Sequence, residues 1–144
     1  MKKPLIWRIA LTAYLLGLAT VGFWPSPVDR PVQGMLARVI RYLHVNGWPS
    51  WFDYHFIEAS ANVVLFIPFG ILAALALPRR ASWQQTAIGF TTSMCMEIGQ
   101  MLFIPARFSS LLDVVTNTVG TVIGVGLVRL LLRGKTVKPT EERH

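Results

Sequence analysis

Four long apolar runs alternate with polar segments along the chain. They cover about residues 5–24, 59–77, 85–104 and 113–132, and the second run contains no charged residue. A helix rises about 1.5 Å per residue, so runs of this length can cross, or nearly cross, a hydrocarbon core about 30 Å thick. The pattern predicts an all-α integral membrane protein of about four transmembrane helices in one domain, followed by a disordered tail over residues 136–144.

A shorter helix is predicted between the first two runs. Its apolar residues recur with a period of 3.6 residues, while Gln33, Arg38 and Arg41 face elsewhere. This segment is too short to span a bilayer, so we expect it to lie in the membrane interface, within the first outer loop. The apolar positions are Val32, Met35, Leu36, Val39, Ile40 and Leu43.

The first apolar run has two interpretations, a retained span or a cleaved signal peptide. It follows Lys2 and Lys3, but it is long, and no clear small-x-small cleavage site precedes Phe23. Trp7 and Trp24 stand at its two ends, where the aromatic belts of a transmembrane helix lie. We therefore favour a retained span.

The distribution of basic residues predicts the orientation. Cytoplasmic segments of membrane proteins carry an excess of Lys and Arg. With the N-terminus inside, the inner segments hold most of the basic residues, and only Arg30, Arg38, Arg41 and Arg107 fall outside. The sequence thus predicts a multi-pass protein with both termini in the cytoplasm. The inner basic residues are Lys2, Lys3, Arg8, Arg79, Arg80, Arg129, Arg133, Lys135, Lys138 and Arg143.

The composition agrees with a membrane protein and excludes an ordinary soluble bundle. Hydrophobic residues make up 53% of the chain and charged residues 15%. The formal net charge of +7 arises from basic residues that mostly flank the apolar runs, where they can contact lipid phosphates. We predict membrane lipids as partners and no nucleic acid, because no basic patch is interleaved with aromatics. The single cysteine, Cys95, cannot form an intrachain disulfide.

Polar residues of three spans are predicted to gather in the outer half of the bilayer. The two polar residues of each span are three or four positions apart and so share a helix face. A carboxylate facing lipid costs about 2.5–3.5 kcal/mol, so Glu97, which lies inside an apolar run, should face protein or water, with Arg107 as its natural partner. The gathered residues are Glu58, Asn62, Glu97, Gln100, Arg107, Asp113 and Asn117.

Several of these residues also have structural interpretations. Glu58 and Asp113 stand near span N-termini, where a carboxylate caps a helix and complements its dipole. Asn117 has an alternative, purely structural interpretation as a residue that forms a hydrogen bond between neighbouring helices. Gly120 and Gly124 follow it in a GxxxG spacing that permits close helix packing, including packing against a second copy of the chain.

A metal site is conceivable at His44, Asp53 and His55, but their spacing matches no strong ligand pattern. We therefore predict no metal and no other cofactor.

Three segments resemble the VanZ-like family of bacterial membrane proteins. They are NVVLFIPFG (62–70), EIGQ (97–100) and ARFSSLLDVVTNTVG (106–120), and the resemblance covers about residues 55–130. It implies a protein of the bacterial cytoplasmic (inner) membrane. The founding member of the family is associated with resistance to teicoplanin, a lipoglycopeptide that binds cell-wall precursors outside the membrane. The matching positions are Asn62, Phe66, Pro68, Gly70, Glu97, Gln100, Arg107, Asp113, Asn117, Thr118 and Gly120.

One departure from the family pattern concerns the fourth span. Family members often carry extra acids between the arginine and the aspartate, where this chain has Ser110 and Leu112. Asp113 is thus the sole acid there, which weakens any transfer of a multi-carboxylate or metal-dependent site.

Three functions remain open from the sequence. We favour a non-enzymatic protein that binds or shields a lipid-linked precursor or a lipoglycopeptide through Asn62, Glu97, Gln100, Arg107, Asp113 and Asn117. One alternative is a membrane-embedded enzyme acting on an envelope lipid, with Glu97 as acid/base and with Arg107 and Asp113 holding a phosphate or ester. The other is an oligomeric transporter or assembly subunit, joined through Gly120 and Gly124. No Ser/His or Cys/His pair near these residues supports nucleophilic catalysis.

Overall fold

The computed structural model describes residues 3–24, 33–104 and 110–135, and all its regular structure in these ranges is helical. The all-α fold class is therefore confirmed. The tail predicted over residues 136–144 lies outside the described residues. The helices are α1 (Lys3–Gly22), α2 (Gln33–Val45), α3 (Tyr54–Ala76), α4 (Ser82–Phe103) and α5 (Leu111–Lys135).

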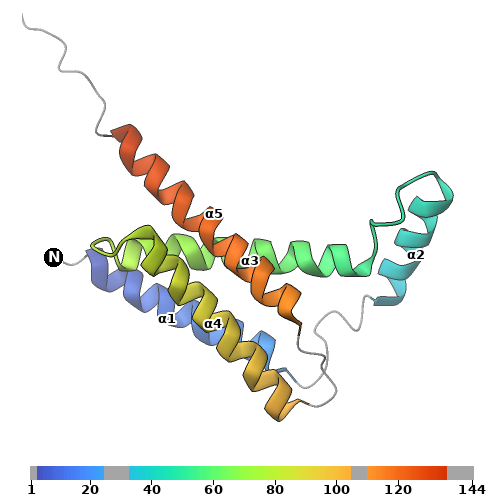
Figure 1. Ribbon diagram of the computed structural model, residues 1–144, viewed down its shortest axis with the longest axis horizontal. Helices are drawn as coiled ribbons and strands as arrows, with labels where there is room; N and C mark the ends of the chain where they lie inside the picture. Colours follow the sequence, from blue (N-terminus) through green and yellow to red (C-terminus); the bar gives the residue numbers. More distant parts are fainter. Residues whose placement is uncertain (1–2, 25–32, 105–109, 136–144) are drawn as a thin grey trace, which may run out of the picture.

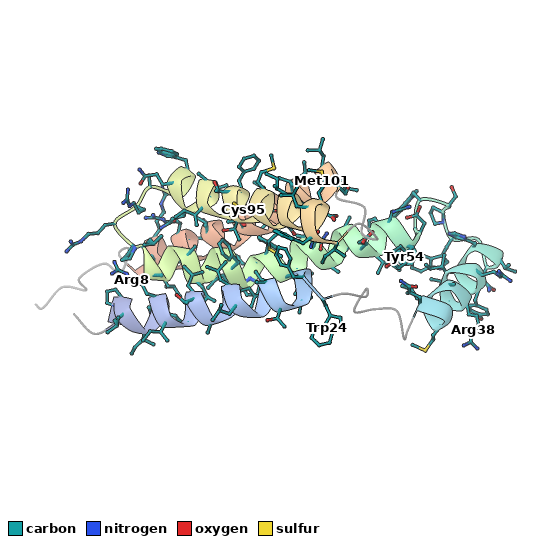
Figure 2. The ribbon with its side chains drawn as sticks, turned by 90° about the horizontal axis from the view of Figure 1, so that it is seen from below. Arg8, Trp24, Arg38, Tyr54, Cys95 and Met101 are labelled. Atoms are coloured by element: carbon teal, nitrogen blue, oxygen red, sulfur yellow. The ribbon has the colours of Figure 1, made fainter. Side chains whose placement is uncertain are left out.

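The four long helices run alternately in opposite directions, and α2 stands apart beside the beginning of α3 (Figure 1). One end of the bundle holds the beginnings of α1 and α4 and the ends of α3 and α5. We call it the arginine end, because Arg8 and Arg129 donate there to the backbone carbonyls of Ala76 and Arg80. The opposite end is the cluster end. Figure 2 shows the two ends along α1, with Arg8 near its start and Trp24 just beyond its last turn.

Three of the described helices are long and apolar enough to cross a membrane: Pro4–Gly22, Tyr54–Ala76 and Leu111–Gly134. Helix α4 has 22 residues, which is long enough, but its many polar residues lower its hydropathy. Length and composition therefore support three spans among the described helices, and they do not confirm the fourth predicted span, α4. Whether α4 can also lie in lipid depends on where its polar side chains point.

The polar side chains of α4 point into the bundle. Its buried residues follow one another at intervals of three or four positions, which places them on a single face of the helix. The opposite face is mostly apolar and exposed, and includes Ile98. Met101 is exposed as well and lies on the outside of the bundle (Figure 2). Only the inward face of α4 is thus strongly polar. The buried residues are Gln85, Gly89, Ser93, Glu97 and Gln100, and we call them the α4 stripe.

Helices α3 and α5 pack backbone against backbone. A Cβ atom added to Gly120 would meet the carbonyl oxygen of Val63, and one added to Gly124 would meet that of Ile67. On the facing helix, a Cβ on Gly70 would meet the backbone of Thr121. Small residues allow this close approach, which increases dispersion contact between membrane helices. Gly120 and Gly124 thus pack against α3 of the same chain.

Helix α1 closes the other side of α3. Leu18 packs in a buried cluster with Phe66, Phe69 and Ala73. The Tyr14 hydroxyl donates a hydrogen bond of 2.6 Å to the carbonyl of Leu65, one turn before Pro68. A neighbouring helix thus binds α3 in the region where proline interrupts the ladder of backbone hydrogen bonds.

Substituting Gly120 or Gly124 with alanine should destabilise the bundle by about 1–3 kcal/mol, because the new methyl group meets backbone, which cannot rotate away. The measurement is thermal unfolding of the purified protein in detergent. Gly126→Ala is the matched control, because a Cβ there meets nothing within 4 Å. Equal melting temperatures for Gly124→Ala and Gly126→Ala would contradict the observed packing.

Candidate functional site

Two hydrogen bonds connect different helices at the cluster end. Asn62 of α3 donates from Nδ2 to Oδ1 of Asp113 on α5, at 2.8 Å. Gln100 of α4 donates from Nε2 to the carbonyl oxygen of Gly22, the last residue of α1, at 2.9 Å. Each of the four long helices therefore contributes to this end, and Asn62, Gln100 and Asp113 all make contacts between helices there.

Glu97 is only 7% exposed, so its carboxylate faces protein. Its Oε2 accepts a hydrogen bond of 2.9 Å from the backbone N–H of Ser110, immediately before α5. The first N–H groups of a helix have no partner within that helix, and its N-terminus favours negative charge. Glu97 thus helps to cap a neighbouring helix, a role that the sequence analysis did not consider.

The beginning of α5 is stabilised by side chains of its own as well. The Ser110 hydroxyl oxygen accepts a bond of 3.2 Å from the N–H of Leu112, and Asp113 lies in the first turn. Two carboxylates, Glu97 and Asp113, therefore adjoin the same helix N-terminus. A carboxylate in that position is stabilised by the helix dipole.

Asn117 lies deeper in the bundle and is 6% exposed. Its Nδ2 donates to the Ser93 hydroxyl of α4 at 2.8 Å. Its Oδ1 is buried and accepts no hydrogen bond from any residue that the structure describes. A buried acceptor without a donor costs about 1–3 kcal/mol, so this atom is a place where a water or a ligand hydroxyl or amide would bind favourably.

Of the other two predicted members, one is not described by the structure and one lies outside the cluster. Arg107 falls between the described ranges. Glu58 lies 3.9 Å from His55, on an exposed part of α3. The capping role expected for Glu58 belongs instead to Asp53, whose carboxylate accepts the Phe56 N–H at 2.9 Å. The reason is that α3 begins at Tyr54, earlier than residue 59, so Glu58 falls in its second turn.

The three residues considered for a metal have separate contacts. His44 Nε2 lies 3.0 Å from the carbonyl oxygen of Phe52, while Asp53 caps α3 and His55 neighbours Glu58. Within residues 3–24, 33–104 and 110–135, no three His, Cys, Asp or Glu side chains come together as a metal site requires.

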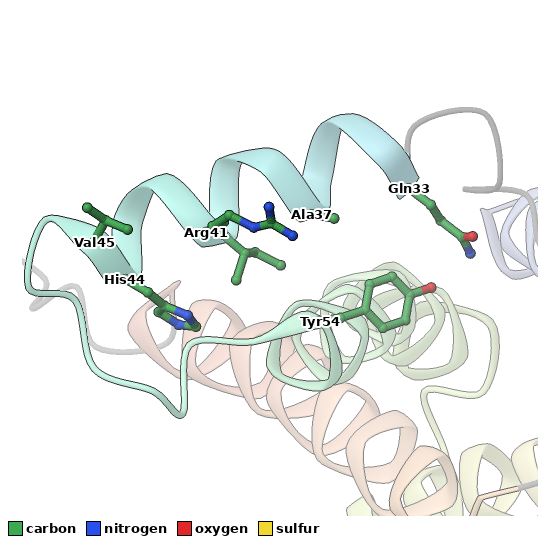
Figure 3. Close-up of a pocket in the computed structure, with 7 residues that line it drawn as sticks. Gln33, Ala37, Arg41, His44, Val45 and Tyr54 are labelled. Atoms are coloured by element: carbon green, nitrogen blue, oxygen red, sulfur yellow. The ribbon is translucent and has the colours of Figure 1, made fainter.

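An open groove lies between α2 and the start of α3, beside the cluster end (Figure 3). Its volume is about 780 Å³, and it combines polar side chains with apolar ones. Helix α2 has no buried residue, and its apolar side chains Met35 and Val39 are exposed. The polar residues that line the groove are Gln33, Arg41, His44 and Tyr54.

Sequence reasoning missed Ser93 and Ser110, the partners of Asn117 and Glu97. A signal for Ser93 was present, because it precedes Glu97 by four residues and so shares its helix face. Ser110 gave no such signal. Its backbone N–H, rather than its side-chain type, makes the contact with Glu97.

Glu97→Ala should lower the free energy of unfolding by about 1–3 kcal/mol, because the Ser110 N–H loses its acceptor in a partly buried place. Glu97→Gln should retain most of the stability, since its amide oxygen can accept the same bond. Thermal unfolding in detergent measures both variants. If the two variants were equally destabilised, the cap would not be the main contribution of Glu97 to stability.

Comparison with known proteins gives matches to one family. The sequence matches the VanZ/LLP1 family over residues 11–132. It is also 34% identical over 76 residues to Protein VanZ of Enterococcus faecium, an alignment that covers 53% of this chain and 47% of that protein. The chain thus spans about half the length of this curated relative. No solved structure matches the fold. The family match covers most of the chain and includes every described residue of the cluster, and this chain therefore belongs to the VanZ/LLP1 family.

Proposed function

We propose that this chain binds an anionic, lipid-linked cell-wall precursor, or a lipoglycopeptide antibiotic of the teicoplanin type, at the extracytoplasmic face of the bacterial cytoplasmic membrane. Binding would shield the cell-wall precursor from the antibiotic without any chemical reaction. The observation that carries the proposal is the polar cluster at one end of a largely apolar bundle, in which Glu97, Gln100 and Asn117 are buried and Asn62 and Asp113 are half-buried. Polar and ionisable groups are costly within membrane helices, and they concentrate at functional sites. The described residues of the cluster are Asn62, Glu97, Gln100, Asp113 and Asn117.

The chemistry of this end suits a ligand with an anionic head that also carries hydroxyl or amide donors. The N-terminus of α5 lies there, and its dipole favours negative charge. Arg107, between Ile104 and Ser110 in the chain, supplies a guanidinium that matches phosphate geometry. The Asn117 Oδ1 atom can accept a bond from a sugar hydroxyl or a peptide amide.

A lipid tail would lie along the exposed apolar surface below the cluster. Val64 of α3 and Val115 and Val119 of α5 are exposed in the isolated chain, as lipid-facing residues would be. In this proposal α2 rests in the membrane interface, with its exposed apolar side chains toward the lipid. The groove that holds Arg41 and His44 would then lie at headgroup level.

The proposal requires that α4 also crosses the membrane and that both termini are cytoplasmic. The inward direction of the α4 stripe supports a crossing, because its outer face is mostly apolar. The basic residues at the arginine end support the orientation.

Cysteine labelling in cells tests the crossing of α4. In a Cys95→Ser background, Leu111→Cys should react with a membrane-impermeant maleimide in spheroplasts whose inner membrane is intact. Arg79→Cys should react only after permeabilisation. Both positions are exposed and flank α4, so they differ mainly in the side of the membrane. Labelling of both in sealed spheroplasts would contradict the crossing.

Expression in a teicoplanin-sensitive bacterium tests the function. The wild-type chain should raise the inhibitory concentration of teicoplanin, and Arg107→Ala should abolish the rise. Arg79→Ala, at the arginine end, is the matched control and should behave as wild type. Glu97→Gln should keep the fold but lose the rise, if the negative charge orients the ligand-binding arginine. All variants are compared at equal membrane abundance. No rise with the wild type, or an equal rise with Arg107→Ala, would refute the proposed binding.

A further inference from the structure

The arginine end carries a second arrangement of polar groups, which the proposed function does not use. Backbone carbonyls at the end of α3 and in the turn after it receive side chains from all three other long helices. Arg8 of α1 donates to the Ala76 carbonyl at 3.4 Å, and Gln85 of α4 donates to that of Leu77 at 2.9 Å. Arg129 of α5 donates to the Arg80 carbonyl.

These bonds hold the guanidinium of Arg129 in a fixed place. Its Nη2 bonds to the Arg80 carbonyl and lies 3.4 Å from Oε1 of Gln85, which is itself fully buried. Both contacts use Nη2, so the guanidinium keeps other N–H donors for a further acceptor. A guanidinium fixed in this way loses little conformational freedom on binding an anion.

A groove of about 660 Å³ lies beside this guanidinium, between the first turns of α4 and the second half of α5. At the arginine end its walls carry the hydroxyl of Ser82 and the guanidinium groups of Arg129 and Arg133. Farther from the arginine end, toward the middle of α5, the wall is formed by Gly126 and Val122. The groove thus changes from cationic to apolar along its length.

We propose that this groove binds an anionic phospholipid, with its phosphate at the arginine end and an acyl chain along the apolar part. Charge complementarity supports an anionic occupant, because the groove-lining residues that the structure describes include two arginines and no acid. The N-terminus of α4 adds its positive dipole end beside Ser82. The length of apolar wall supports a lipid rather than a free phosphate, since Val122 and Leu130 leave apolar surface exposed along the groove.

Gly126 provides a specific way to block the groove. A Cβ at Gly126 would meet nothing within 4 Å, so a leucine there fits the backbone and places its side chain in the groove. Gly17→Leu is the matched control, because it makes the same change on α1, away from the groove, and a Cβ there also meets nothing within 4 Å. Arg133→Gln removes charge without affecting the bonds made by Arg129.

The experiment measures lipid binding to the purified full chain by native mass spectrometry. Dioleoyl phosphatidylglycerol should bind more tightly than dioleoyl phosphatidylcholine. Gly126→Leu should weaken phosphatidylglycerol binding about tenfold, because the leucine occupies the place of the acyl chain. Arg133→Gln should weaken it about tenfold as well, because one charge-assisted contact with the phosphate is lost. Gly17→Leu should bind as the wild type does.

Three results would overturn the proposal. The first is equal affinity of phosphatidylglycerol for Gly126→Leu and Gly17→Leu, and the second is equal affinity of the wild type for the two lipids. The third is saturation of the groove by soluble glycerol 3-phosphate at the same concentration, which would identify a free phosphate as the occupant. Thermal unfolding of each variant without lipid verifies that it is folded. None of these outcomes depends on the teicoplanin assay.

Discussion

Hydrocarbon offers no hydrogen-bond partner, so the polar side chains of a membrane bundle must be satisfied within it. The α4 stripe meets this constraint by forming hydrogen bonds with α1, with α5 and with the turn after α3. Helix α4 therefore links the other long helices to one another. The stripe contacts are Gln100 with the end of α1, Gln85 with the turn after α3, and Ser93 and Glu97 with α5 and the residue before it.

The stripe reaches its partners because α3 and α5 approach each other so closely. Glycines in both helices remove the side chains that would separate the two backbones. This places Asn62 opposite Asp113 and brings the beginning of α5 beneath Glu97. Polar contacts at the cluster end and apolar packing at the bundle centre are therefore parts of one arrangement. Among the described residues, Glu97 and Asp113 adjoin the N-terminus of α5, whereas Arg8 and Arg129 bond to carbonyls at and after the C-terminal end of α3.

Hydropathy and periodicity predicted much of the fold, since they depend on local sequence. The four apolar runs correspond to α1, α3, α4 and α5, and the short amphipathic segment corresponds to α2. Local pattern does not identify tertiary partners. The GxxxG spacing predicted close packing of Gly120 and Gly124, but not that their partner is α3 of the same chain. Similarly, the burial of Glu97 could be predicted from the cost of a charge in lipid, whereas its bond to Ser110 depends on how the chain returns after α4.

The first helix has a consequence for how the protein can be produced. Its residues bind α3 and α4 along their length, through Tyr14, the buried Leu18 and the Gly22 carbonyl. A recombinant chain whose first helix was exchanged for a foreign, cleavable leader would lack one wall of its core. The Gln100 amide would then lose its acceptor, and Phe69 would lose part of its cover. Expression vectors for this protein should therefore carry affinity tags at the C-terminus and leave the native first helix in place.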